Sequence, residues 1–112
     1  MMTVSRNNFG LTERDMTTLF AIFQKYPEIK QVTIFGSRAK GTWKTGSDVD
    51  LAIVNDKVSF KTLLSLKSDF EESNLPYKID LVQLPQLKNS DLIEHINRVG
   101  VMFYSNEKIL IT

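Results

Sequence analysis

Apolar positions near the start of the chain recur at helical spacing. Within "LTERDMTTLFAIFQKYPEI" (11–29) they fall three or four residues apart, at Met16, Leu19, Phe20, Phe23 and Tyr26. Thr12 is suited to cap this helix, and Glu13 and Asp15 are favourable charges in its first turn. Pro27 is expected to end the helix near Tyr26.

Four shorter segments have the composition or the alternation of β-strands. They are "QVTIFGS" (31–37, stopped by Gly36), "DVDLAIV" (48–54), "IDLVQL" (79–84) and "VMFY" (101–104). In the second segment, alternation places Val49, Leu51 and Ile53 on one face. The other positions, two of them acidic, turn to the opposite face: Asp48, Asp50 and Ala52. This strand therefore predicts one apolar face and one face with carboxylates.

Two further helices are expected between the later strands. Ser59 caps the first of them, whose apolar face holds Phe60, Leu63, Leu64 and Phe70. Asn89 or Ser90 starts the second, and Gly100 is expected as its C′ residue. Residues 105–112 are expected to form a flexible or docking tail.

The order of these elements is α-β-β-α-β-α-β, which predicts an α/β (α+β) fold in a single domain over residues 1–112. A short loop between the first two strands favours an antiparallel pair. The helix between the second and third strands favours a parallel crossover. We therefore expect a mixed four-stranded sheet with helices mainly on one face.

Composition narrows the class of protein. The chain has 112 residues, 42% of them hydrophobic and 24% charged, with a formal net charge of +1 and no cysteine. The absence of cysteine excludes disulfides and thiolate zinc sites. The small net charge gives no overall electrostatic field that would attract nucleic acid or a membrane. The start "MMTVSRNNFG" lacks an apolar signal region, and no apolar run approaches membrane-spanning length. We expect a cytoplasmic protein.

Three aspartates are candidates for catalysis and metal binding. Asp48 and Asp50 lie two positions apart on a strand, so their side chains share a face with Cα atoms about 6.5 Å apart. Asp80 lies within an apolar strand and joins them if the third strand pairs with the second. Such an oxygen-donor set suits Mg²⁺ or Mn²⁺ rather than zinc. The alternatives are ordinary turn acids at 48 and 50 and a solvent-facing edge residue at 80.

The segment before these acids suits a phosphate. Gly36 allows a tight turn that exposes backbone N–H groups, and Ser37 offers a hydroxyl. The charge partners for a triphosphate are Arg38, Lys40 and Lys44. The alternative is a plain turn followed by a solvated basic loop. The Gly-Lys-Ser/Thr ending of a P-loop and the glycine spacing of a dinucleotide fingerprint are both absent.

Other conspicuous residues favour packing roles. Trp43 is expected to anchor the loop rather than stack on a base, and His95 to lie at the surface or a rim. Tyr77 and Tyr104 are expected to pack in the ordinary way.

The spacing Gly-Ser, ten residues, Asp-x-Asp in "GSRAKGTWKTGSDVD" resembles the signature of the nucleotidyltransferase superfamily that includes DNA polymerase β. "FGSRAKG…SDVDLAI" is similar in particular to its minimal nucleotidyltransferases, the MNT proteins. The resemblance implies that Gly36 and Ser37 hold a nucleoside triphosphate, and Arg38 matches the arginine common after Gly-Ser in this family. Together with Lys44 of the basic loop, these are the expected nucleotide-binding residues. The resemblance implies that Asp48, Asp50 and Asp80 bind Mg²⁺ (or Mn²⁺) and carry catalysis. Asp80 would bind metal or activate the acceptor hydroxyl.

The resemblance also implies a partner. MNT proteins act as antitoxins to HEPN-domain ribonucleases, and some transfer AMP from ATP to a tyrosine of that toxin. Larger relatives carry a second domain for the acceptor; this chain ends soon after its fourth strand, so we expect the acceptor on another protein. Two alternatives stay open: a non-catalytic nucleotide-binding antitoxin that acts by occlusion, and a transferase for a small molecule such as an aminoglycoside. Direct contact with nucleic acid is not expected.

Overall fold

The computed structural model describes residues 5–106 of the chain. Its helices are α1 (Glu13–Gln24), α2 (Gly36–Lys40), α3 (Phe60–Glu72) and α4 (Ser90–Val99), with one 3₁₀ turn (Leu84–Gln86). Its strands are β1 (Gln31–Phe35), β2 (Val49–Ile53), β3 (Ile79–Gln83) and β4 (Val101–Ser105). Within the described range, no helix is long and apolar enough to cross a membrane. The tail predicted at 105–112 lies outside this range from residue 107 onward.

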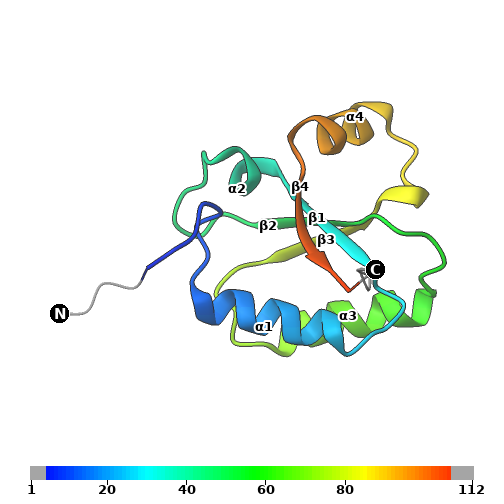
Figure 1. Ribbon diagram of the computed structural model, residues 1–112, viewed down its shortest axis with the longest axis horizontal. Coiled ribbons are helices and arrows are strands. Elements are labelled where there is room, and N and C mark those ends of the chain that lie inside the picture. The colour runs from blue at the N-terminus through cyan, green and yellow to red at the C-terminus, as the bar shows by residue number, and fades with distance from the viewer. Residues whose placement is uncertain (1–4, 107–112) are drawn as a thin grey trace, which may run out of the picture.

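The four strands form one mixed sheet in the order β3-β2-β1-β4 (Figure 1). β1 pairs antiparallel with both β2 and β4, and β2 pairs parallel with β3. The predicted antiparallel and parallel pairings are both confirmed. β3 and β4 are the two edge strands, so the chain must cross the whole sheet between them.

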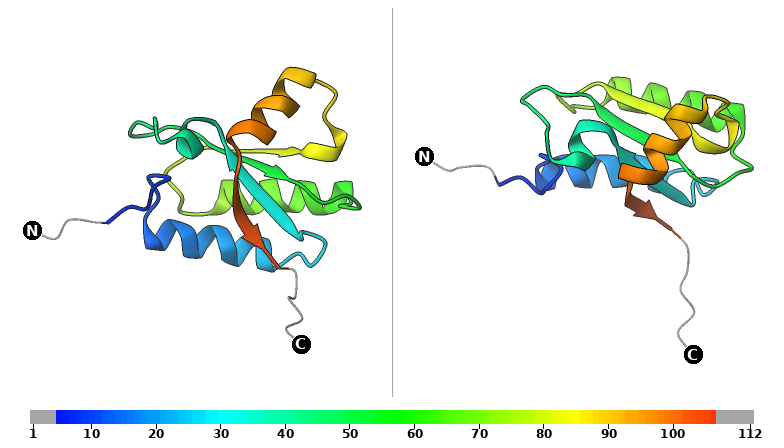
Figure 2. Two further views of the ribbon diagram at one scale, coloured as in Figure 1. Left: turned by 45° about the horizontal axis from the view of Figure 1, so that its top comes forward. Right: turned by 90° about the horizontal axis from the view of Figure 1, so that it is seen from above.

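Helices cover both faces of the sheet (Figure 2). The two longest, α1 and α3, share one face as expected, whereas α4 lies on the other. The reason is topological. The crossover through α3 moves outward from β2 to β3, and the crossover through α4 moves back across the sheet to β4. Because parallel crossovers are right-handed, steps in opposite directions place their helices on opposite faces.

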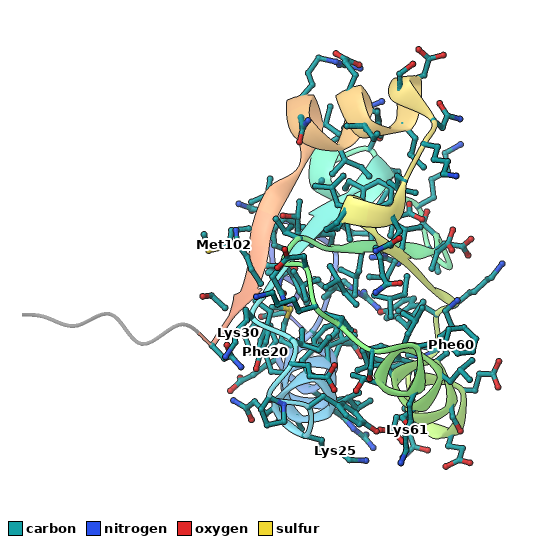
Figure 3. The ribbon with its side chains drawn as sticks, turned by 90° about the vertical axis from the view of Figure 1, so that its right-hand side faces the viewer. Phe20, Lys25, Lys30, Phe60, Lys61 and Met102 are labelled. Atoms are coloured by element: carbon teal, nitrogen blue, oxygen red, sulfur yellow. The ribbon has the colours of Figure 1, made fainter. Side chains whose placement is uncertain are left out.

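The larger hydrophobic core lies between the sheet and the α1–α3 layer. It is built from residues of both layers, among them Leu19, Phe23, Ile34, Leu51 and Leu66. A smaller cluster under α4 consists of Phe35, Ala52 and Ile96 with partly buried neighbours. Some large apolar side chains are exposed, and Figure 3 shows two of them, Phe60 of α3 and Met102 of β4, at opposite sides of the molecule.

The helix starts follow the sequence closely. Thr12 caps α1 in a capping box with Asp15, Ser59 caps α3, and Asn89 caps α4. The prediction for Gly100 was wrong in its conformation: it is the C-cap of α4, with extended backbone at φ −66° instead of a left-handed C′ residue. A Cβ there would collide with the Ile96 carbonyl oxygen and with Thr33, so this glycine is needed for space.

Candidate functional site

The turn from β1 into α2 is made by Gly36, at φ +72°. A side chain here would be strained by that backbone conformation, and its Cβ would also collide with Oδ2 of Asp50. Gly36 therefore lets the backbone pass directly beside the Asp50 carboxylate. Phe35, the N-cap residue of α2, makes no side-chain capping bond, so the first N–H groups of this short helix have no side-chain cap.

Strand pairing sets the positions of the acids. Phe35 of β1, Asp50 of β2 and Asp80 of β3 are successive cross-strand partners, which gives one row across three strands. Asp48 immediately precedes β2, and Asp48, Asp50 and Asp80 together are called the acidic row below. Asp50 is half-buried, whereas Asp48 and Asp80 are exposed. The register thus confirms that the third strand pairs with the second and that Asp80 lies beside Asp50, on the sheet face covered by α4.

The electrostatics of this row centre on Asp50. Burial, then the neighbouring carboxylates of Asp80 and Asp48, raise the pKa of Asp50 above its ordinary value. His95 and Arg38 act in the opposite direction and do not cancel the rise. The ionised form of Asp50 therefore carries a free-energy cost that a nearby cation would relieve.

The donor chemistry at this row fits a hard divalent ion, since its candidate ligands are carboxylates and the chain has no cysteine. Within residues 5–106, however, no three His, Asp or Glu side chains form a group arranged to hold a metal ion. The register brings Asp50 and Asp80 together, but convergence of all three carboxylates on one ion stays a prediction.

Arg38 lies in a different environment from the one its basic loop suggests. Its side chain is buried, with 1% of the residue exposed. The guanidinium donates to the carbonyl oxygens of Phe9, Gly10 and Ser47 at 2.8–3.2 Å. These contacts tie the loop to the N-terminal segment, and they favour a positioning role over the nucleotide contact predicted for Arg38.

Ser37 precedes the loop that Arg38 holds, and Lys44 lies within that loop. Ser37 is half-buried in α2, and its carbonyl oxygen accepts a hydrogen bond from the Thr42 N–H at 3.0 Å. Lys44 is exposed, and its backbone N–H donates to Ser47 Oγ at 2.9 Å. Nucleotide binding by these two residues stays a prediction.

Trp43, Tyr77 and Tyr104 have the packing roles expected of them, and His95 lies at a rim, as also expected. Trp43 is half-buried, and its Nε1 donates to the Asn8 carbonyl at 3.3 Å. Tyr77 donates to Asp15 at 2.9 Å, and Tyr104 stacks on Phe23. His95 is half-buried at the rim of the acidic row, edge-on to Phe35 with ring centroids 6.2 Å apart.

Sequence reasoning missed two neighbours of the site. It placed His95 at a rim without linking it to Asp50, because the α4 face could not be assigned from helical spacing alone. It also interpreted Asp15 only as a helix-start charge, although Asp15 is buried and accepts a hydrogen bond from Tyr77. Neither interaction, the electrostatic one of His95 with Asp50 or the hydrogen bond of Tyr77 to Asp15, has a local sequence signal, since the partners lie far apart in the chain.

Comparison with known proteins agrees with this geometry. The family model for polymerase beta nucleotidyltransferases matches residues 17–109. A Haemophilus influenzae protein named "Probable protein adenylyltransferase MntA" is 33% identical over 99 residues, which cover 88% of this chain and 86% of that protein.

Solved structures share the fold. One is a toxin–antitoxin structure with AMP-PNP (TM-score 0.65, 21% identity, 83% of this chain and 75% of that one). Another is the tri-AMPylated Shewanella oneidensis HEPN toxin in complex with MNT antitoxin (TM-score 0.58, 18% identity, 81% and 70%). With its turn, its acidic row and these matches, the chain belongs to the polymerase beta nucleotidyltransferase family and is similar to the MNT antitoxins within it.

Proposed function

We propose that this protein is a Mg²⁺-dependent nucleotidyltransferase that transfers AMP from ATP to a tyrosine hydroxyl of a HEPN-domain ribonuclease toxin and thereby acts as its antitoxin. Family membership and the similarity to a protein named as an adenylyltransferase support the reaction class. The relative whose structure contains an AMPylated HEPN toxin supports the acceptor.

The single observation that carries the proposal is the contact between the glycine turn and the acidic row. Gly36 lies directly against the Asp50 carboxylate, and Asp50 is the cross-strand partner of Asp80. A triphosphate held by the backbone of Gly36 and Ser37 would therefore lie next to the carboxylates that are proposed to bind its metal. Phosphoryl chemistry needs this combination of positioning and charge neutralisation.

Each residue has a proposed task. Gly36 and Ser37 hold phosphate oxygens, and the exposed Lys44 adds positive charge near them. Asp48, Asp50 and Asp80 would hold Mg²⁺, which when bound neutralises charge on the α-phosphate and on the leaving pyrophosphate. Asp80 lies on an edge strand and is exposed, so an acceptor from another protein can reach it.

The proposed transfer is a single displacement. The tyrosine oxygen bonds to the α-phosphorus of ATP, and the bond from that phosphorus to the oxygen bridging the β-phosphate breaks. Pyrophosphate leaves with that bond's electron pair, and the tyrosine proton passes to a carboxylate, for which Asp80 is the candidate. The product is an AMP–tyrosine phosphodiester.

The test uses a purified HEPN toxin partner encoded beside this chain. We expect transfer of label from [α-³²P]ATP to that protein with Mg²⁺ and none with a chelator, and we expect the labelled residue to be tyrosine by peptide mass spectrometry. Asp48→Ala/Asp50→Ala should abolish labelling. Asp56→Asn, an exposed aspartate outside the row, is the matched control and should label normally.

Toxin neutralisation in cells separates catalysis from occlusion. The proposal expects Asp48→Ala/Asp50→Ala to lose protection while still forming the complex. Full protection by that variant would favour the non-catalytic antitoxin instead. Labelling of an aminoglycoside, but not of the toxin, would favour the small-molecule transferase.

A further inference from the structure

Arg38 is a buried cation, and its hydrogen bonds to residues 5–106 all go to the backbone. Within the described part of the chain, its Nε and Nη2 donate to the Ser47 carbonyl oxygen at 3.2 and 2.8 Å. Its Nη1 donates to the carbonyl oxygens of Phe9 and Gly10 at 2.9 and 3.2 Å. The planar fork of a guanidinium suits such divergent acceptors, which a lysine cannot satisfy together.

Aromatic rings complete this environment. The guanidinium carbon lies 4.4 Å from the Tyr77 ring centroid and 5.8 Å from that of Trp43. The Tyr77 hydroxyl donates in turn to the buried Asp15 at the start of α1. Burial is the main influence on the pKa of Arg38 and lowers it, so holding this charge inside the protein is costly.

The contacts of Arg38 reach every segment that carries a proposed site residue. Arg38 itself follows Gly36 and Ser37 in α2. Ser47, which accepts two of its hydrogen bonds, directly precedes Asp48. Tyr77, which lies against its guanidinium, is three residues before Asp80. One side chain therefore connects the nucleotide turn to the approaches of both acidic strands.

We infer that Arg38 is a positioning residue: it fixes the separation between the Gly36–Ser37 turn and the carboxylates of Asp48, Asp50 and Asp80, and it does not contact the nucleotide. The inference rests on the proposed function for its catalytic consequence. Its structural part, the fastening of residues 41–48, holds independently of that function.

The test compares Arg38→Lys and Arg38→Met with the wild type, with Arg98→Lys as control. Arg98 is an exposed arginine on α4 that pairs with Glu94, which is also exposed. We expect kcat for AMP transfer to fall about 10²-fold in the Arg38 variants because the reacting groups are misplaced. The dissociation constant for AMP-PNP should change by less than about threefold, well under a tenfold step.

Two further measurements sharpen the test. In Arg38→Lys, hydrogen exchange of the amides at 41–48 should accelerate, while the amides of α3 keep their protection. In Arg38→Ala, added methylguanidinium should restore part of kcat by occupying the vacated space. If Arg38→Met does not fold, the kcat of Arg38→Lys and its hydrogen exchange still test whether Arg38 is a positioning residue.

Three outcomes would overturn the inference. One is wild-type kcat in Arg38→Lys. The second is an affinity for AMP-PNP that falls at least about tenfold while the affinity for AMP is unchanged, since that pattern marks a direct contact with the outer phosphates. The third is unchanged exchange at 41–48. If the wild type transfers no AMP, the proposed function fails, and the exchange measurement alone judges Arg38.

Discussion

The two faces of the sheet differ in the side chains that they carry, and the five residues of β2 show the difference. Val49, Leu51 and Ile53 are fully buried under α1 and α3, on the face that supplies most of the core. Asp50, between them, faces the other way and pays an electrostatic cost for its position beside two carboxylates. The first face therefore carries the larger core, whereas the second combines a smaller apolar cluster with carboxylates whose closeness lowers stability.

The largest expected effect of breaking this contrast is on activity. Asp50→Asn keeps the size of the side chain but removes its charge. We expect AMP transfer to fall at least about 10³-fold, because the carboxylate charge that is proposed to hold the metal beside the reacting phosphates is lost. The free energy of unfolding, measured with urea in a chelating buffer, should stay the same or rise, because the pKa of Asp50 shows that its ionised form is disfavoured by folding. A clear loss of stability would contradict the division between the faces.

The neighbouring residue on the same strand should behave in the reverse way. Leu51 is completely buried in the α1–α3 core. Leu51→Ala should lower the free energy of unfolding by about 2–5 kcal/mol, because it removes apolar contacts and leaves a cavity. The fraction that stays folded should still transfer AMP with nearly the wild-type kcat. An activity loss larger than the loss of folded protein would show that the apolar face also shapes the site.

Alternation along β2 and the right-handed crossover made much of this division predictable from the sequence. Asp80 was expected to join Asp50 on the condition that the third strand pairs with the second, and the register confirms that pairing. The cap residues Thr12 and Ser59 were readable for the same reason, since their hydrogen bonds are local. Predictions succeeded where the physical cause lies within a few residues or in a general rule of topology.

Contacts between distant segments were not predictable. Arg38 lies among lysines and glycines and looks solvent-exposed, yet the carbonyls that bury it include those of Phe9 and Gly10, 29 and 28 residues away. Gly100 was expected to supply a left-handed turn, but its need for space comes partly from Thr33 on a neighbouring strand. The side of the sheet that α4 covers was not predictable either, because it depends on the pairing of β4 with β1.

The pH dependence of stability should differ between the faces, beginning with Asp50. Its folded pKa is raised above the ordinary value of 3.8, so folding favours the protonated form of this carboxyl group. The stabilisation that results is complete below pH 3.8 and is lost as pH rises through the folded pKa. We expect the wild type to lose stability relative to Asp50→Asn as pH rises above about 4 in metal-free buffer. Urea unfolding of both proteins over that range measures the difference. Parallel curves would show that Asp50 titrates alike in the folded and unfolded chains.

Asp69 gives the opposite sign on the other side of the molecule, with the smallest expected effect. It joins α3 to the residues directly after α1, because it accepts hydrogen bonds from Tyr26 Oη at 2.5 Å and from Lys25 Nζ at 2.9 Å. The Tyr26 hydrogen bond, followed by that of Lys25, lowers the pKa of Asp69, so its contribution is present above pH 3.8 and is lost as pH falls through the folded pKa. Lys25 is exposed, so solvent and salt screen much of the interaction.

Asp69→Asn should therefore lower the free energy of unfolding slightly at neutral pH and weaken its decrease toward acid pH. Asp50→Asn should instead remove the decrease in the free energy of unfolding that the wild type shows as pH rises above about 4. Urea unfolding of both variants over this pH range measures the two effects. If both variants changed the pH dependence of the free energy of unfolding in the same direction, the folded pKa values of Asp50 and Asp69 would not be shifted in opposite directions.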